Sequence, residues 1–414
     1  MHPPDALQVL LIAHAKDARS GNFPKPENYV DAIRAAFTPW EAEEQARSAT
    51  LAEGERTGAS VKWYFVDGMG KRQQLPPGAA ELNKALHSLV IIFVTSALVK
   101  DAVCVRRLEE IAVAIRSANG SPHGLLPLGT NEAVLAELRA HPRAKVLNET
   151  QGKSLESLAE YAIRPDYAAM LALHRAHLLL TSYPGKKSSA ATAKACFFIS
   201  HAKLDGLPLA ASLREAIKSL PWLDSFYDAR DIQPGDDWAR ILEVGVQDSM
   251  LLALRTDSYD QRFWCRREVM WAERYDRPVL LIDARTLLLA RPSVLGFTGV
   301  PGVRIPDGNL VRVLAEALRE WVRIGVFRRR CTAAIAGNAS LAKRTEFLSR
   351  PPTVESLDGA LERLQARAAP KHALIVHPDP ALEGSNGTAV QTLMRSRFPK
   401  GTVLSLRSFL AQLP

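Results

Sequence analysis

Short apolar runs that end in a polar residue recur along the chain, and apolar residues between them return at helical spacing. Three of the runs end in histidine: LLIAHAK at 10–16, FFISHAK at 197–203 and ALIVHPD at 373–379. Continuous apolar runs of this length are typical of parallel strands that are buried on both faces. Strands that alternate with helices predict an α/β protein with flavodoxin-like parallel sheets and helices on both faces.

The first two runs begin stretches of chain that resemble each other beyond the shared I-x-H-A-K. Ser88 precedes Cys104 by 16 residues, and Ser249 precedes Cys265 by the same interval. An apolar, strand-like run follows each serine, and a Pro-Gly pair precedes it. This matched order and spacing predicts that one α/β unit is duplicated along the chain.

The composition of the connecting segments indicates where the copies end. Residues 184–193 are rich in Ser, Ala and Lys, and we interpret them as a linker between a first copy at 1–183 and a second copy at 194–328. Too few residues follow the third histidine to complete another copy. Residues 329–414 are therefore expected to form a helical or βαβ segment of unknown role, with a weakly determined helical stretch over 335–370.

The second copy shows the clearest alternation of elements. Its apolar runs predict strands at 195–200, 223–227, 249–255 and 278–283. Apolar residues at helical spacing predict a helix between the first two strands, through Leu209, Leu213, Ile217 and Leu220. Further helices are predicted from near Asp236 or Asp237, at 264–275 and at 309–324.

Composition narrows the class of protein. A chain of 414 residues is long enough for two or three domains. No apolar run reaches the ~18 residues of a membrane helix, and the first residues lack a signal-peptide pattern, so a cytoplasmic protein without a membrane partner is expected. The four cysteines form no CxxC pair, so neither a metal site nor a disulfide framework is expected. The net charge of +9 comes from scattered basic residues without a nucleic-acid-binding motif, so direct nucleic-acid binding is not expected.

A set of motifs in the second copy resembles the TIR (Toll/interleukin-1 receptor) domain family. In order, the motifs are FYDARDIQPGDDW, QDS and TDSYDQRFWCRREV, and the last contains the W-C-x-x-E that opens a helix in that family. The resemblance covers residues 194 to about 325, and the ordered set is more specific than any one motif. Arg262 stands where the family usually has a serine, and this difference affects the capping of that helix more than the position of the glutamate. The first copy is read as a degenerate TIR-like domain in tandem.

The resemblance implies an enzyme of the bacterial NAD-cleaving type. Many TIR domains cut the nicotinamide–ribose bond of NAD+, and the family's catalytic glutamate corresponds to Glu268. The family's substrate-binding loops correspond to Ser200 and His201 and to the loop from Asp228 to Trp238. NAD+ is then a substrate, and no cofactor is expected. The resemblance further implies activation by self-association through TIR domains, a role in anti-phage immunity and a partner protein of a defence system.

The residue types suit this chemistry. Nicotinamide leaves as a neutral molecule from a cationic ring, so the ribose passes through an oxocarbenium-like state that a nearby carboxylate stabilises. Trp264 lies four residues before Glu268, so the two share a helical face on which the tryptophan could wall a pocket. Arg230 could meet the diphosphate or pair with Asp228 or Asp231.

Each assignment has a structural alternative. Glu268 could be a solvated glutamate in the first turn of a helix, where the dipole favours it. Trp264, Tyr259 and Cys265 could serve only in packing. His201 is as suited to capping the strand loop as to contacting a ligand.

The first copy differs from the second at the positions that the resemblance assigns to catalysis. Alignment on Cys104 places Val103 at the position of the tryptophan and Arg107 at that of the glutamate, with Glu109 and Glu110 nearby. This copy is therefore predicted to lack catalysis and to act as a scaffold, a regulator or a ligand sensor. For the whole chain, the alternatives to an enzyme are a non-catalytic adaptor or oligomerisation module and a nucleotide sensor.

Overall fold

The computed structural model describes residues 5–17, 26–37, 59–66, 78–117, 122–157, 164–181, 194–226, 238–286, 300–305, 308–379, 381–382 and 384–413. The chain forms two compact units, Met1–Ala191 and Thr192–Pro414. The predicted linker at 184–193 lies outside the described residues, as do the acidic-loop residues 227–237. Within the described residues, no helix combines the length and apolar character needed to cross a membrane.

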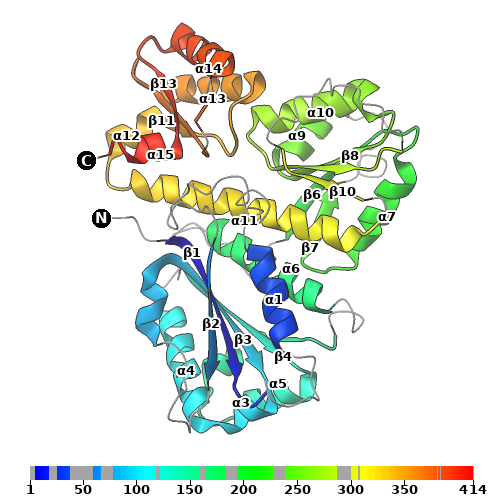
Figure 1. The fold of residues 1–414 in the computed structure, drawn as a ribbon, viewed down its shortest axis with the longest axis vertical. Coiled ribbons are helices and arrows are strands. Elements are labelled where there is room, and N and C mark those ends of the chain that lie inside the picture. The colour runs from blue at the N-terminus through cyan, green and yellow to red at the C-terminus, as the bar shows by residue number, and fades with distance from the viewer. Residues whose placement is uncertain are drawn as a thin grey trace. The chain divides into compact units, whose positions relative to one another are not determined.

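The first unit is built on a five-stranded parallel sheet with the order β2-β1-β3-β4-β5 (Figure 1). Its strands are β1 (Asp5–His14), β2 (Ser60–Val66), β3 (Ala85–Val94), β4 (His123–Gly129) and β5 (Lys153–Ser154). Successive side chains of a strand point to opposite faces, and β1 and β3 are buried at nearly every position because both faces of the sheet are covered.

Helices cover both faces of this first sheet. Leu10 and Ile12 of β1 pack in one cluster with apolar residues of α3 (Ser96–Lys100), α4 (Ala102–Ser117) and α5 (Glu132–Ala140). Helices α1 (Pro26–Phe37) and α6 (Arg164–Thr181) contact each other, and Tyr29 of α1 packs 6.1 Å from Phe93 of β3 between ring centroids. The short 3-10 helices are η1 (Ala79–Lys84) and η2 (Leu147–Glu149).

The second unit repeats this strand order. Its sheet contains β6 (Ala195–His201), β7 (Leu223–Phe226), β8 (Met250–Arg255), β9 (Val279–Asp283) and β10 (Gly302–Arg304), in the order β7-β6-β8-β9-β10 and parallel throughout. Its helices are α7 (Leu207–Lys218), α9 (Trp238–Gln247), α10 (Phe263–Arg274) and α11 (Leu310–Ala334), with the 3-10 helix η4 (Tyr259–Gln261). The expected flavodoxin-like α/β class is confirmed in both units.

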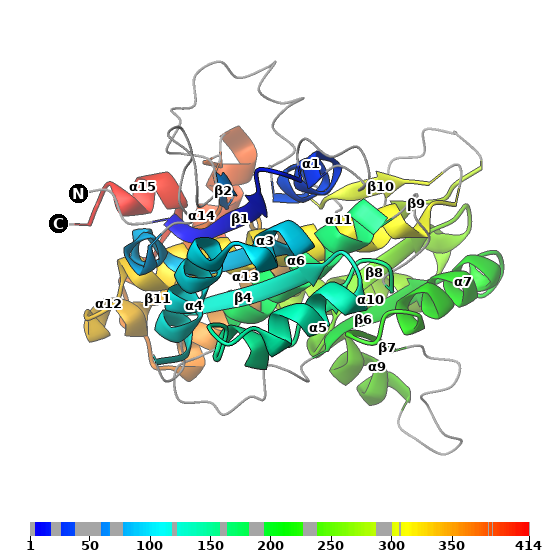
Figure 2. The same cartoon turned by 90° about the horizontal axis from the view of Figure 1, so that it is seen from below.

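Helix α11 is longer than its apolar pattern predicts, and the predicted boundary at residue 328 falls inside it. The first part of α11 packs on the second sheet, whereas Phe327 and Cys331 join the core beneath a third sheet. Figures 1 and 2 show this helix running from β9 and β10 to the region of α12 and β11. Because both ends have an apolar surface to cover, the helix continues across the boundary.

The C-terminal segment forms a three-stranded parallel sheet in the order β11-β12-β13. Its elements are α12 (Ala339–Arg344), β11 (Thr345–Phe347), α13 (Val354–Ala366), β12 (Leu374–His377), α14 (Gly384–Arg397), β13 (Thr402–Ser405) and α15 (Leu406–Leu410). The weakly determined helical stretch predicted over 335–370 is wrong at β11, where three residues form a strand. Pairing with β12, almost 30 residues later in the chain, makes these three residues a strand.

Candidate active site

The predicted site residues of the second unit meet at the carboxyl ends of two neighbouring strands, β6 and β8. Ser200 and His201 end β6, Tyr259 lies in η4 just after β8, and Glu268 lies in the second turn of α10. In this strand order the chain leaves β6 toward β7 on one side, while β8 lies on the other side. Ligands of doubly wound sheets bind at such a switch point, so the location suits a binding or catalytic site.

A hydrogen-bond chain connects three buried side chains at this point. The Ser200 hydroxyl donates to Glu268 Oε2 at 2.5 Å, and Ser200 Oγ lies 2.6 Å from the Tyr259 hydroxyl oxygen. Ser200 is 1% exposed, Tyr259 is 0% exposed and Glu268 is 6% exposed. The sequence therefore brings together residues that are 59 and 68 positions apart from Ser200.

The direction of this chain follows from the acidity of its members. Burial raises the pKa of Tyr259 well above its usual value, and the nearby Cys265 and Glu268 raise it further, so the phenol keeps its proton. Because the Ser200 hydroxyl uses its hydrogen in the bond to Glu268, the Tyr259 hydroxyl is the donor in its bond with Ser200. The carboxylate thus receives a hydrogen bond whose donor is itself held in place by a buried tyrosine.

Cys265, three residues before Glu268, is unsuited to act as a nucleophile. It is 3% exposed, and burial together with the charge of Glu268 raises the pKa of its thiol to about 12. A protonated, buried thiol is a poor nucleophile. The packing interpretation of this cysteine agrees with its place in the core cluster below α10.

An ion pair and two hydrogen bonds stabilise the loop that carries Tyr259. Arg255, at the end of β8, makes a two-pronged ion pair with Asp260, with nitrogen–oxygen distances of 3.0 Å and 2.5 Å. Asp205, which follows β6, accepts hydrogen bonds from the Thr256 and Ser258 hydroxyls at 2.7 Å and 2.5 Å. These bonds connect the segments that follow β6 and β8 and so fix Tyr259 relative to Ser200.

Residues 197–292 match the family model of the TIR domain. This segment is therefore similar to the TIR family, and we refer to it below as the TIR domain. No curated protein matches the chain. The matched range contains Ser200, Tyr259 and Glu268, so the buried hydrogen-bond chain lies inside the TIR domain.

The other predicted site residues of the TIR domain do not take part in the hydrogen-bond chain of Tyr259, Ser200 and Glu268 among the described contacts. His201 is 8% exposed, and its Nδ1 lies 3.4 Å from the Ile199 carbonyl oxygen, which suits a strand-end role. Trp238 opens α9, and Lys203 Nζ lies 4.8 Å from the centroid of its ring. Asp228 and Arg230 fall outside the described residues, so their expected roles stay predictions.

Trp264 packs among residues on the outer side of α10. It is 38% exposed and lies 5.4 Å from Phe263 and 6.5 Å from Trp271 between ring centroids, while the Arg267 guanidinium lies 5.8 Å from its ring. A cavity of about 560 Å³ opens on this side of α10, next to the start of α13, and neither Trp264 nor Glu268 belongs to its described lining. The expected pocket shared by Trp264 and Glu268 stays a prediction.

The bracing residues carry no motif that identifies them from sequence. Asp205, Arg255 and Asp260 are recognised only by their hydrogen bonds. One signal was nevertheless present, because a threonine precedes the aligned cysteine by nine residues in both copies, Thr95 and Thr256. In the first unit Thr95 donates to an aspartate after β1, Asp17, at 2.6 Å, just as Thr256 donates to Asp205.

The first unit has a different set of side chains at the corresponding place. Ala13 precedes the strand-end histidine where the TIR domain has Ser200. The two acidic alternatives near Arg107 are engaged elsewhere: Glu110 pairs with Arg107, and Glu109 accepts hydrogen bonds from the backbone N–H groups of Val146 and Leu147. These contacts support the prediction that the first unit lacks the catalytic carboxylate.

Proposed function

We propose that the TIR domain cleaves NAD+ at the nicotinamide–ribose bond, with Glu268 as the catalytic carboxylate. The observation that carries the proposal is the buried chain from Tyr259 through Ser200 to Glu268 at the switch point of the sheet. A glutamate that served only as a solvated residue in a helix would not be 6% exposed and held by a buried serine.

The arrangement accounts for how a carboxylate contributes to this reaction. Loss of nicotinamide leaves positive charge on the ribose, and a negative oxygen fixed nearby stabilises that charge more in the transition state than in bound NAD+. Ser200 orients the carboxylate before substrate arrives, so little reorganisation remains for the reaction step. His201 and Trp238 lie at the ends of the elements around this edge and are the described candidates for substrate contacts.

The decisive experiment measures nicotinamide release by the full chain, alone and after forced clustering, for the wild type and Glu268→Gln. Glutamine keeps the shape of the side chain and the acceptor for Ser200 but removes the charge. We expect the rate to fall by about a hundredfold or more, as when one electrostatic contact to a transition state is lost. The matched control is Glu215→Gln on α7, an exposed glutamate remote from the carboxyl edge, which should keep the wild-type rate. Equal rates for wild type and Glu268→Gln in the clustered state would exclude the mechanism.

A second candidate function is assembly without catalysis, as an adaptor or oligomerisation module. TIR domains in general associate with one another. The observation that favours it is the exposed apolar surface of α10, where Phe263 is 57% exposed, Met270 is 48% exposed and Trp264 is 38% exposed. Assembly with intact NAD+ in every clustered sample would support this candidate. Tight binding of an unreacted nucleotide would instead support a nucleotide sensor.

The biological setting belongs to the same proposal. An NAD+-consuming TIR domain that is activated by self-association suits an effector of bacterial anti-phage immunity, which acts in the cytoplasm with a defence-system partner. What supports this setting is the match of residues 197–292 to the TIR family together with the buried carboxylate.

A further inference from the structure

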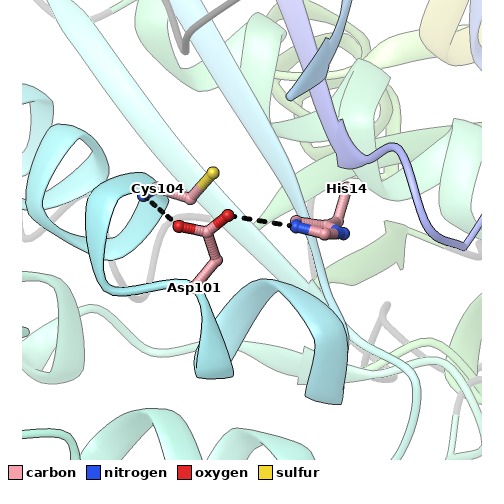
Figure 3. Close-up of side chains that lie close together, drawn as sticks. All are labelled: His14, Asp101 and Cys104. Carbon is pink, nitrogen blue, oxygen red and sulfur yellow. Dashed lines mark hydrogen bonds and ion pairs between the residues drawn. The ribbon is translucent and has the colours of Figure 1, made fainter. Parts of the chain in front are cut away.

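Three side chains of the first unit converge at the carboxyl edge of its sheet, where the TIR domain has its candidate active site. They are His14 at the end of β1, Asp101 between α3 and α4, and Cys104 in the first turn of α4 (Figure 3). One nitrogen, one carboxylate oxygen and the sulfur lie within 4.8 Å of one another. His14 is 1% exposed, Cys104 is 0% exposed and the Asp101 side chain is 13% exposed, so the carboxylate is the member that solvent reaches.

Backbone N–H groups orient two of these three side chains, Asp101 and His14. Asp101 Oδ1 accepts hydrogen bonds from the N–H groups of Val103 and Cys104 at the start of α4, and its Oδ2 faces His14 Nε2 at 3.3 Å. His14 Nδ1 accepts a hydrogen bond from the Lys16 N–H at 3.3 Å, so the N–H of the ring lies at Nε2 and points at Asp101. A proton therefore stands between the two groups.

We propose that His14, Asp101 and Cys104 bind one divalent transition-metal ion of the Zn²⁺ class, which replaces this proton. Zinc takes imidazole nitrogen and carboxylate oxygen at roughly 2.0–2.2 Å in tetrahedral geometry, which separates the two ligand atoms by about 3.3–3.5 Å. The observed nitrogen–oxygen distance of 3.3 Å meets this requirement without movement of either element. Mixed nitrogen, oxygen and sulfur donors are typical of zinc sites and not of Mg²⁺ or Ca²⁺ sites.

The position of Cys104 suits a metal-bound thiolate. The sulfur lies in the first turn of a 16-residue helix, where the backbone N–H groups favour negative charge. It belongs to no disulfide. A tetrahedral site with sulfur at about 2.3 Å needs a sulfur–nitrogen distance of roughly 3.6 Å, and the Cys104 sulfur lies within 4.8 Å of the nitrogen before any metal binds.

Metal binding displaces two protons, one from His14 Nε2 and one from the Cys104 thiol. The imidazole proton moves from Nε2 to Nδ1, which breaks the 3.3 Å hydrogen bond from the Lys16 N–H. The thiol proton of Cys104 leaves to solvent, and the metal–nitrogen and metal–sulfur bonds form in place of the N–H and S–H bonds. Three protein ligands leave one tetrahedral position for water or for a ligand of the first unit.

The site is specific to the first unit. The TIR domain keeps the histidine and the cysteine as His201 and Cys265, but Arg262 occupies the position of Asp101, and a guanidinium cannot ligate a cation. The first unit thus lacks the carboxylate of the TIR site and gains a different one three residues before its cysteine.

The test uses the purified full chain, stripped of metal and titrated with Co²⁺. A thiolate ligand gives Co²⁺ a strong near-ultraviolet charge-transfer band, so we expect one such band at one Co²⁺ per chain and its loss on addition of equimolar Zn²⁺. Cys196→Ser, which removes the half-buried thiol of the second unit, is the control and should leave the band unchanged. Absence of the band, or its persistence in Cys104→Ser, would overturn the proposal.

Two further variants keep the test decisive if Cys104→Ser does not fold. Asp101→Asn keeps the acceptor for the α4 backbone but weakens the ligand, and His14→Gln removes the nitrogen donor. Both should lower the apparent affinity for Co²⁺ at least tenfold in chains whose circular dichroism matches the wild type. Unchanged affinity in folded Asp101→Asn and His14→Gln would exclude the site, even if a thiolate band were present.

Discussion

A carboxylate that is 6% exposed keeps its charge only where donors replace the water that it has lost. For Glu268 one such donor is Ser200, and the donor to Ser200 is Tyr259. Sequence order predicted Glu268 from the W-C-x-x-E motif and Ser200 from the loop that follows the first strand. It left Tyr259 between packing and a pocket wall, and the structure shows a role in which the phenol orients the serine instead.

The contribution of Ser200 can be measured separately from that of Glu268. Ser200→Ala removes the hydrogen bond to a charged group, which is worth about 1.5–3 kcal/mol, so nicotinamide release should fall by about tenfold to a hundredfold. The loss should appear mainly in kcat, because the bond orients the reacting carboxylate rather than the whole substrate. Ser200→Thr keeps the hydroxyl and should recover part of the rate. A KM change with an unaltered kcat would show that Ser200 contacts substrate and does not position Glu268.

The spacing of the ligands along the chain explains why the sequence did not reveal the proposed metal site. The cysteine pattern argued against any metal site because no close pair of ligands is visible along the chain. His14 and Asp101 are 87 residues apart and meet only because β1 and β3 are neighbours in the sheet. Local spacing finds sites that lie on one turn or one helix, whereas this cluster depends on strand order.

At the scale of elements, α10 has two different sides. One side carries Glu268 toward β6, and the other packs against α13 of the C-terminal segment. Gly359 of α13 lies so close to α10 that a Cβ there would be 2.1 Å from the Arg274 carbonyl oxygen. The helix with the candidate catalytic carboxylate is therefore held by the C-terminal segment as well as by its own sheet.

Glu273 lies at the contact between α10 and α13 and makes the stability of the second unit depend on pH. Burial raises its pKa from 4.5 to about 7, while the nearby Arg350 lowers it and Glu355 raises it. Because the folded protein holds this proton more tightly than the unfolded chain, the stability of the second unit should fall as pH rises from about 4.5 to 7 and change little above that from this group. The shift corresponds to at most about 3 kcal/mol.

The measurement is urea unfolding of the wild type and Glu273→Gln at pH 5, 6, 7 and 8. Glutamine keeps the acceptor for the Thr353 hydroxyl but cannot ionise, so the variant should lose this decline and be more stable than the wild type at pH 8. Glu215→Gln serves as the control for a change of net charge. A parallel pH profile in Glu273→Gln would show that the carboxylate is solvated or paired in the folded protein.

Elements differ in how far local pattern determines them. The strands of the second copy came close to their predicted limits because each is a continuous apolar run between polar turns. Strand β11 was missed because three residues carry no periodicity, and only pairing with β12 makes them a strand. The length of α11 was underestimated because its last turns are apolar toward a sheet that the local sequence does not reveal.

At the scale of the whole molecule, the two five-stranded sheets share one strand order, which agrees with the duplication inferred from spacing. Both units have the strand-end histidine and the cysteine, yet the first has Asp101 where the second has Arg262, and Arg107 where the second has Glu268. One scaffold thus presents a proposed metal site in one unit and a buried carboxylate with a proposed catalytic role in the other, since both depend on side chains at the same edge.

Within the second unit, the TIR domain and the C-terminal sheet are joined through Asp276. This residue is 6% exposed and has a φ of 52°, and its carboxylate accepts hydrogen bonds from the Ser349 N–H and hydroxyl and from Arg328. Asp276→Gly removes these bonds while glycine accepts the left-handed backbone. Loss of a buried acceptor with several donors should cost about 2–4 kcal/mol, measured by urea unfolding.

The matched control for Asp276→Gly is Ala368→Gly, at the other described non-glycine position with positive φ. This change relieves the same backbone strain without removing a side-chain hydrogen bond, so the free energy of unfolding should stay equal or rise slightly. Hydrogen exchange should locate the effect of Asp276→Gly, with faster exchange at Ser349 and along α13, because Asp276 holds the chain that leads into this helix. If both glycine variants behaved alike, the Asp276 carboxylate would contribute nothing to stability, and the junction would rest on its other contacts, which include α11 and the packing of α10 against α13.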